Sequence, residues 1–203
     1  MSAFAADERC DGLVVAVAAG DPWWSAVRSR LSRPVIEATG GAERSDSVRL
    51  ALETLASRVA DDPWVLVHDA ARPCVERADI DALLAGVAAH PDGALLALPL
   101  SDTLKRQSEA ATPATVERTE SRSGLWRALT PQVFRLRRLL EALRAAAREG
   151  RVPSDESQAI EWAGLGRPLL VAGAAANVKV TTPADLALVA TILAARAAPG
   201  AGT

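Results

Sequence analysis

Lysine is scarce in this chain. Only Lys105 and Lys179 are lysines among the 23 basic residues, and all the others are arginines. An ammonium is a compact point charge whereas a guanidinium is a wide fork, so the two cations do different work. A lysine kept in so arginine-rich a chain is therefore a candidate for function, and Lys179 is the stronger case; the alternative is that two lysines remain by chance.

Cysteine is just as sparse. Cys10 and Cys74 lie far apart and form no Cys-x-x-Cys pair, which argues against a disulfide framework and against a zinc site. No apolar run reaches membrane-spanning length. Residues 1–12 contain no basic region followed by an apolar stretch, so no secretory signal is visible. We therefore expect a cytoplasmic protein with no membrane contact.

Long blocks of one charge are also missing. The net charge is −2, and no basic stretch is long enough to suggest a nucleic-acid footprint. The 203 residues, 49% apolar and 24% charged, are ordinary for one large α/β domain. These features favour a small-molecule partner and exclude nucleic acid.

Strand-like and helix-like segments alternate along the chain. Short apolar runs or helical spacing of apolar residues predict strands at 13–18, 34–38, 64–67, 94–98 and 169–172, a last strand at 177–180, and helices at 45–60, 78–89, 135–148 and from 182 onward. A short helix is also predicted after the sequence Ser-Asp-Glu at 154–156. This alternation is typical of a parallel sheet with helices on its faces.

Residues 99–123 interrupt the alternation. They are polar and contain two short extended pieces on either side of a turn. A disordered loop is possible from composition alone, but two extended pieces suit a projecting β-arm better. Long connections of this kind inside compact domains are usually functional or mobile.

The most informative local feature is a strand that runs directly into charged residues. Residues 64–67 are apolar and are followed by Asp69 and Arg72, with Pro73 stiffening the turn. In open parallel sheets, ligands bind beyond the carboxyl ends of the strands. An acid at that place can hold a metal or a hydroxyl, and an arginine can take phosphate through its fork. The alternative is a simple ion pair in a loop.

Two further segments follow strands in the same way. Gly40 and Gly41 precede a helix that contains Ser47, where close backbone approach and unpaired N–H groups suit an anion or a base edge, although a plain turn and cap would look the same. Lys179 precedes a helix that starts at Thr182, which places a cation beside N–H donors. That combination suits a phosphate or the charge that develops during phosphoryl transfer.

Four other sites give weaker signals. Thr130 could hydrogen-bond a substrate. Trp126 is more typical of a core, and Asp155 with Glu156 is more typical of a helix cap. His68 follows a buried strand and is expected to be a hydrogen-bonded histidine at the edge of the core.

At these residues the chain resembles the 2-C-methyl-D-erythritol 4-phosphate cytidylyltransferases of the non-mevalonate isoprenoid pathway. The matching strings occur in the family's order over nearly the whole chain. They are Gly-Gly-Ala-Glu-Arg-Ser-Asp-Ser at 40–47, Val-Leu-Val-His-Asp-Ala-Ala-Arg-Pro-Cys at 65–74, Asp-Thr-Leu-Lys-Arg at 102–106, Gly-Leu-Trp-Arg-Ala-Leu-Thr-Pro-Gln at 124–132, Ser-Asp-Glu at 154–156, and Lys-Val-Thr at 179–181 with Pro183 and Asp185-Leu186. The second and fourth strings together are specific.

The resemblance implies a single nucleotidyltransferase domain over residues 1–203, with a Rossmann-like, mostly parallel sheet and helices on both faces. It also implies a homodimer formed through the arm at 99–123, a requirement for Mg²⁺, and transfer of CMP from CTP to the polyol phosphate with release of pyrophosphate. The phosphate of the substrate attacks the α-phosphorus of CTP in line.

The resemblance also assigns roles to residues. The nucleotide-binding residues it implies are Gly40, Gly41, Ser47, Asp69 and Ala70. The substrate-binding residues it implies are Arg72, Thr103, Arg122, Thr130, Lys179 and Thr181, of which Thr103 and Arg122 would serve the partner subunit. Lys179 and Asp69 would be catalytic, and Asp69 would also hold the metal.

One family feature is not found. The family opens with a strand, a loop of the form Ala-Ala-Gly-x-Gly-x-Arg-Met and then Pro-Lys-Gln. The nearest match, Val17-Ala-Ala-Gly20, continues as Asp-Pro-Trp-Trp. We therefore expect this N-terminal glycine-rich, CTP-binding segment to be lacking, and slow or absent turnover. Two alternatives stay open: a ribitol-5-phosphate-type cytidylyltransferase, and a catalytically silent dimeric relative.

Overall fold

The computed structural model describes residues 2–109 and 112–197. The helices are α1 Ser2–Ala5, α2 Trp24–Arg28, α3 Arg44–Ala56, α4 Arg77–Ala89, α5 Leu136–Arg148, α6 Glu156–Trp162 and α7 Pro183–Ala197. The strands are β1 Leu13–Val17, β2 Val35–Thr39, β3 Trp64–Val67, β4 Ala94–Pro99, β5 Leu104–Gln107, β6 Val116–Glu120, β7 Trp126–Arg135 and β8 Leu169–Ala172.

The central sheet is mixed rather than mostly parallel. Its four strands lie in the order β3-β7-β4-β8; β7 is antiparallel to both of its neighbours, and β4 is parallel to β8. β1 and β2 pair in parallel as a separate sheet. β7 was not predicted from the sequence; Pro131 lies inside it, and proline is rare in central strands.

Helices cover both faces of the central sheet, as expected. Alternate residues of β3 enter two separate cores, because side chains along a strand alternate between its faces. Val65 lies with Phe134 and the apolar residues of α3, α5 and α6. Leu66 packs against the other core, which contains Val133 and the inward residues of α4. The sheet is therefore a rigid platform whose strand ends are available for a site.

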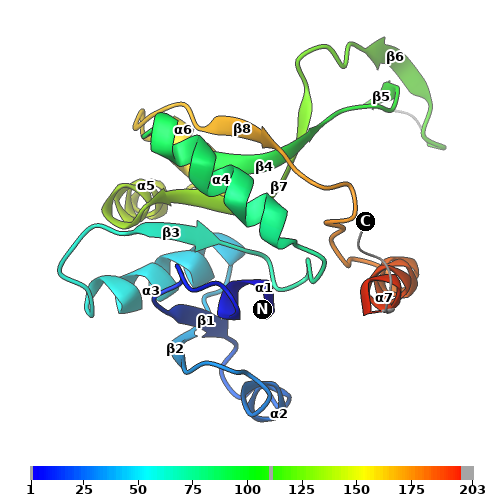
Figure 1. The fold of residues 1–203 in the computed structure, drawn as a ribbon. Coiled ribbons are helices and arrows are strands. Elements are labelled where there is room, and N and C mark those ends of the chain that lie inside the picture. Colours follow the sequence, from blue (N-terminus) through cyan, green and yellow to red (C-terminus); the bar gives the residue numbers. More distant parts are fainter. Residues whose placement is uncertain (1, 110–111, 198–203) are drawn as a thin grey trace.

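The segment at 99–123 contains a two-stranded antiparallel hairpin. Leu104 pairs with Glu120 and Arg106 with Arg118. β5 and β6 project away from the rest of the chain (Figure 1). The two extended pieces predicted within 99–123 are thus paired strands, and their role as a dimerisation arm stays a prediction.

The expected last strand at 177–180 is wrong. These residues form no strand, and they cross the end of β3 as an irregular segment. Val180 N donates to Ala71 O at 2.8 Å, and Asn177 Nδ2 donates to Thr130 O at 2.7 Å. These two hydrogen bonds hold the run in place without a ladder. Lys179 lies between the two anchors in the sequence and contacts Asp69, just beyond the end of β3.

The helix that follows begins as predicted. Asp185 Oδ2 accepts hydrogen bonds from the backbone N–H groups and from the hydroxyls of Thr181 and Thr182, at 2.8–3.0 Å. These bonds hold the pKa of the Asp185 carboxyl at about 2. Because α7 starts immediately after Lys179, this cap also fixes the segment that carries the lysine.

None of the helices within the described ranges combines the length and the apolarity needed to cross a membrane. Cys10 and Cys74 are both free, and Cys74 is fully buried.

Candidate active site

The end of β3, the middle of β7 and the segment before α7 bring four predicted site residues together. Lys179 Nζ lies 2.9 Å from Asp69 Oδ2, and Arg72 Nε lies 3.8 Å from the same oxygen. Asp69 N donates to Thr130 Oγ1 at 3.0 Å. The acid, the guanidinium, the hydroxyl and the ammonium predicted from separate strings therefore form one cluster.

The Asp69 carboxylate lies between two cations. Its second oxygen, Oδ1, accepts a hydrogen bond from Arg44 Nε at 2.8 Å. Burial raises the pKa of this carboxyl, but the hydrogen bond from Lys179 and the charge of Arg44 outweigh burial, so the pKa lies below its usual range. Asp69 is thus ionised at neutral pH and has both oxygens engaged.

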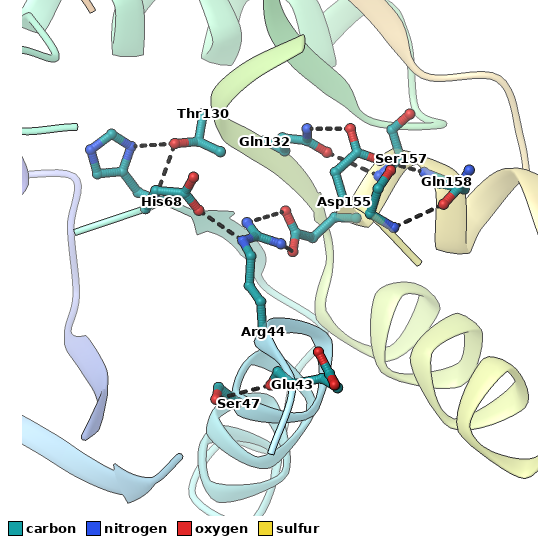
Figure 2. A network of polar contacts seen from close by, with 12 residues as sticks. Glu43, Arg44, Ser47, His68, Thr130, Gln132, Asp155, Ser157 and Gln158 are labelled. Carbon is teal, nitrogen blue, oxygen red and sulfur yellow. Dashed lines mark hydrogen bonds and ion pairs between the residues drawn. The ribbon is translucent and has the colours of Figure 1, made fainter. Parts of the chain in front are cut away.

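Arg44 is the functional residue that the sequence analysis did not single out. It lies at the start of α3, and its two terminal nitrogens donate to Glu156 Oε1 and Oε2 at 2.7 and 3.1 Å. Figure 2 shows this side chain reaching from α3 toward the strand ends. Burial raises the pKa of Glu156, and the fork of Arg44 limits that rise. Arg44 itself is held charged because the Glu156 and Asp69 contacts outweigh burial and raise its pKa.

The hydrogens of the Thr130–His68 pair can be assigned from the partners. His68 Nε2 lies 2.9 Å from Arg72 O, and a carbonyl only accepts, so Nε2 carries the hydrogen. Burial lowers the pKa of His68, which keeps the ring neutral. Nδ1 is then an acceptor, and the Thr130 hydroxyl 3.0 Å away donates to it (Figure 2). As the sequence predicted, His68 is satisfied on both nitrogens.

Arg72 retains a free hydrogen-bond donor. Its Nη1 donates to Asn177 O at 2.9 Å, while its buried Nε has no hydrogen-bond partner among the described residues. Burial lowers the pKa of this guanidinium. The Oδ1 atom of Asn177, whose side chain is buried, is likewise without a partner in the part of the chain described. Unpaired polar groups are rare inside proteins and call for an explanation, such as a ligand.

The glycine turn lies at the start of the helix that carries Arg44. Gly41 N donates to Ser47 Oγ at 3.0 Å, and Ser47 Oγ donates to Glu43 O at 3.2 Å. A Cβ on Gly41 would lie 2.3 Å from the Cβ of Asp46. Only glycine therefore fits at position 41, and the turn is fixed in place next to α3.

Besides the glycine turn, four predicted site residues lie outside the cluster of Asp69, Arg72, Thr130 and Lys179. Thr103 and Arg122 are exposed in the arm region, where Arg122 Nη1 donates to Ser101 O. Thr181 is bound to Asp185 in the cap of α7. Ala70 is exposed beside Asp69. The roles predicted for these four residues therefore stay predictions.

The expected Mg²⁺ site depends on one carboxylate, that of Asp69. Among residues 2–109 and 112–197, no group of three or more His, Cys, Asp or Glu side chains could hold a metal ion. Both oxygens of Asp69 face cations, and both oxygens of Glu156 accept from Arg44. The donor set fits at most one protein ligand for Mg²⁺, which commonly takes one or two carboxylates and completes its shell with phosphates and water.

A mixed sheet flanked by helices, with three cations and two acids gathered at its strand ends, defines an α/β transferase that handles phosphorylated substrates. The model of the family "2-C-methyl-D-erythritol 4-phosphate cytidylyltransferase" matches residues 1–195. The chain belongs to this family.

Curated relatives and solved structures agree with this assignment. The 2-C-methyl-D-erythritol 4-phosphate cytidylyltransferase of Halorhodospira halophila is 50% identical over 190 residues, which are 92% of this chain and 76% of the relative. That of Vibrio atlanticus is 46% identical over 176 residues, covering 87% and 73%.

Among solved structures, a 4-diphosphocytidyl-2C-methyl-D-erythritol synthase matches with a TM-score of 0.83 and 34% identity over 95% of this chain and 85% of that one. The 2-C-methyl-D-erythritol 4-phosphate cytidylyltransferase from Thermus thermophilus matches with a TM-score of 0.76 and 30% identity, over 95% of this chain and 86% of that one. The fold is thus common to this chain and to solved members of the family.

Proposed function

We propose that this chain joins 2-C-methyl-D-erythritol 4-phosphate to the CMP unit of CTP, giving 4-diphosphocytidyl-2-C-methyl-D-erythritol and pyrophosphate. The observation that carries the proposal is the cluster of Asp69, Arg72 and Lys179 at the strand ends, in a chain that belongs to the family. The substrate phosphate attacks the α-phosphorus and pyrophosphate leaves, so negative charge is present on both sides of the reacting centre throughout.

The residues of this chain contribute position and positive charge. The free Nε–H of Arg72 can donate to a phosphate oxygen. Lys179, held by Asp69, presents an ammonium that stabilises phosphate charge in the ground state and in the transition state. Thr130 has already given its hydrogen to His68, so its hydroxyl orients Asp69 and can only accept from a ligand.

The glycine turn and the strand end have the nucleotide-side role in this proposal. Gly40, Gly41, Ser47 and Ala70 would contact the cytidine and its ribose. The turn lies beside the start of α3. Mg²⁺ would bind chiefly to the phosphates and to one oxygen of Asp69, and it would supply charge neutralisation between the phosphates.

Three further parts of the proposal concern the molecule as a whole. The arm would be exchanged in a homodimer, so that Thr103 and Arg122 reach the partner's substrate. Thr181 would approach the substrate from the cap of α7. The two free cysteines suit a reducing cytoplasm.

We also infer weak CTP binding by these 203 residues alone. The family's Ala-Ala-Gly-x-Gly-x-Arg-Met pattern does not occur in the sequence. Backbone N–H groups of such loops cradle phosphates, so their absence removes part of the nucleotide site. The same chain preceded by a segment that carries this strand, loop and Pro-Lys-Gln should bind CTP more tightly. Equal turnover by both polypeptides would contradict the inference.

The experiment measures pyrophosphate release with CTP and Mg²⁺, using either 2-C-methyl-D-erythritol 4-phosphate or ribitol 5-phosphate. We expect turnover with the first substrate, higher in the extended chain. The two lysines supply a matched control: Lys179→Gln should lower kcat by roughly 10²–10³, and Lys105→Gln in the arm should leave it nearly unchanged. Preference for ribitol 5-phosphate, or no nucleotide binding by either chain, would overturn the proposal in favour of the corresponding alternative.

A further inference from the structure

Arg44 joins three elements that are distant in the sequence. It belongs to α3 and contacts Asp69 at the end of β3 and Glu156 at the start of α6. The Glu156 side chain is only 1% exposed and binds both terminal nitrogens of the guanidinium. A bidentate contact of this type fixes the plane of the arginine as well as its distance. Arg44 is therefore held rigidly by a buried anchor.

This anchor decides which way the Asp69 carboxylate faces. With Oδ1 bound to Arg44, Oδ2 lies 2.9 Å from Lys179 and 3.8 Å from Arg72 Nε. Arg72 Nε, which has no hydrogen-bond partner among the described residues, is the nearby group that would compete with Lys179 for a carboxylate free to move. Such a contact would occupy the Nε–H of Arg72 and leave Lys179 without its acid.

We propose that Arg44 is a positioning residue for phosphate transfer: anchored on Glu156, it directs the Asp69 carboxylate to Lys179 and so keeps Arg72 available for a phosphate ligand. The proposal rests on the proposed function for its consequence in catalysis, but the arrangement itself can be tested without any ligand. A purely structural ion pair would stabilise the fold without controlling the partner of Asp69.

The test variant is Arg44→Gln combined with Glu156→Gln. Replacing Arg44 alone would leave Glu156 as an uncompensated buried charge, which destabilises folded proteins strongly. The double variant removes one positive and one negative charge, so the net charge of the site is unchanged and any effect on anions reflects geometry. A matched control is Arg49→Gln with Glu53→Gln, the ion pair of 3.4 Å one turn further along the same helix.

The ligand-free readout uses the two lysines of the chain. Lys179 and Lys105 are acetylated with an amine-reactive reagent, and their relative rates are measured by mass spectrometry; Lys105 in the arm is the internal reference. In the double variant we expect Lys179 to react at least about threefold faster, because the carboxylate that covers its amine has turned away. The control pair should leave the ratio unchanged.

Epistasis with Asp69 separates positioning from general loosening. If Arg44 acts through Asp69, adding the double variant to Asp69→Asn should not change the Lys179 rate further. Calorimetry with 2-C-methyl-D-erythritol 4-phosphate and with inorganic phosphate should show about tenfold weaker binding in the double variant than in the wild-type chain. Urea unfolding confirms that the compared samples are folded.

The outcomes separate this inference from the proposed function. An unchanged Lys179 rate in the folded double variant would overturn the positioning role, and so would a further change in the Asp69→Asn background. If the rate rises as expected but the wild-type chain binds neither the polyol phosphate nor CTP, the positioning role stands and the proposed function fails.

Discussion

Replacing Thr130 by valine should both destabilise the protein and loosen the site. Thr130 is 4% exposed, and its hydroxyl accepts from Asp69 N and donates to His68 Nδ1. Valine has nearly the same shape but bonds with neither. Each polar group that loses its hydrogen-bond partner costs about 1–3 kcal/mol when it stays buried. Water can reach part of this site, so we expect Thr130→Val to lower the free energy of unfolding by about 2–4 kcal/mol.

Thr130→Ser is the matched control. It keeps the hydroxyl and loses one methyl group, which should cost about 1 kcal/mol. Urea unfolding followed by tryptophan fluorescence gives both values by linear extrapolation, provided that the slope m is the same in all variants. Binding of 2-C-methyl-D-erythritol 4-phosphate, measured by calorimetry, should fall in the valine variant and persist in the serine variant. Equal stabilities of the two variants, within about 0.5 kcal/mol, would refute the stabilising role of these two hydrogen bonds.

Three other substitutions test the framework around the site. Gly93 has φ +103°, and a Cβ there would lie 2.3 Å from Phe134 Cδ1. Gly93→Ala should therefore lower the free energy of unfolding in urea by about 2–4 kcal/mol. The control Gly150→Ala should cost clearly less, because φ there is +65° and nothing lies within 4 Å of the added Cβ. Gly41→Ala should weaken CTP binding in the extended chain, because its Cβ would displace Asp46; unchanged binding would argue against a nucleotide-side turn. Asp185→Asn should remove one pH dependence: the Asp185 pKa is lowered from 3.8 to about 2, so its stabilisation is complete above the unfolded value and is lost as pH falls through the folded one. The stability difference between wild type and variant should therefore shrink from neutral pH to about pH 2, and a difference that is constant with pH would contradict the cap.

The elements that were predicted correctly are those whose signal lies in residues close together in the sequence. The strand at 64–67 and the strand at 169–172 have the predicted bounds, and the helix start predicted at Thr182 is capped by Asp185 three positions further on. β7 was missed because its buried residues lie on both faces and Pro131 lies inside it. The run at 177–180 shows the reverse error, since it forms no strand and is held by single hydrogen bonds to Ala71 and Thr130.

The residues of the site also divide into those that have a local signal in the sequence and one that has none. Asp69 and Arg72 follow an apolar strand, so the rule that ligands gather at strand ends was enough to place them. Lys179 was placed with them through an expected strand at 177–180 that the structure does not contain. Arg44 follows two glycines at a helix start and has no such signal. Its partners Asp69 and Glu156 are 25 and 112 positions away in the sequence. The packing of α3 and α6 against α5 brings Arg44 to Glu156, and no local pattern records that packing.

The distribution of charge explains why the cluster suits phosphates. Two acids and three cations share the site, and each acid is already bound to a cation. A metal bound to one Asp69 oxygen would share that oxygen with Lys179 or Arg44. An anion would instead find one unpaired donor on Arg72 and an ammonium that is already oriented. Donors fixed before the ligand arrives need little reorganisation during the reaction. Folding therefore sets the electrostatics of this site, chiefly through the buried anchor at Glu156.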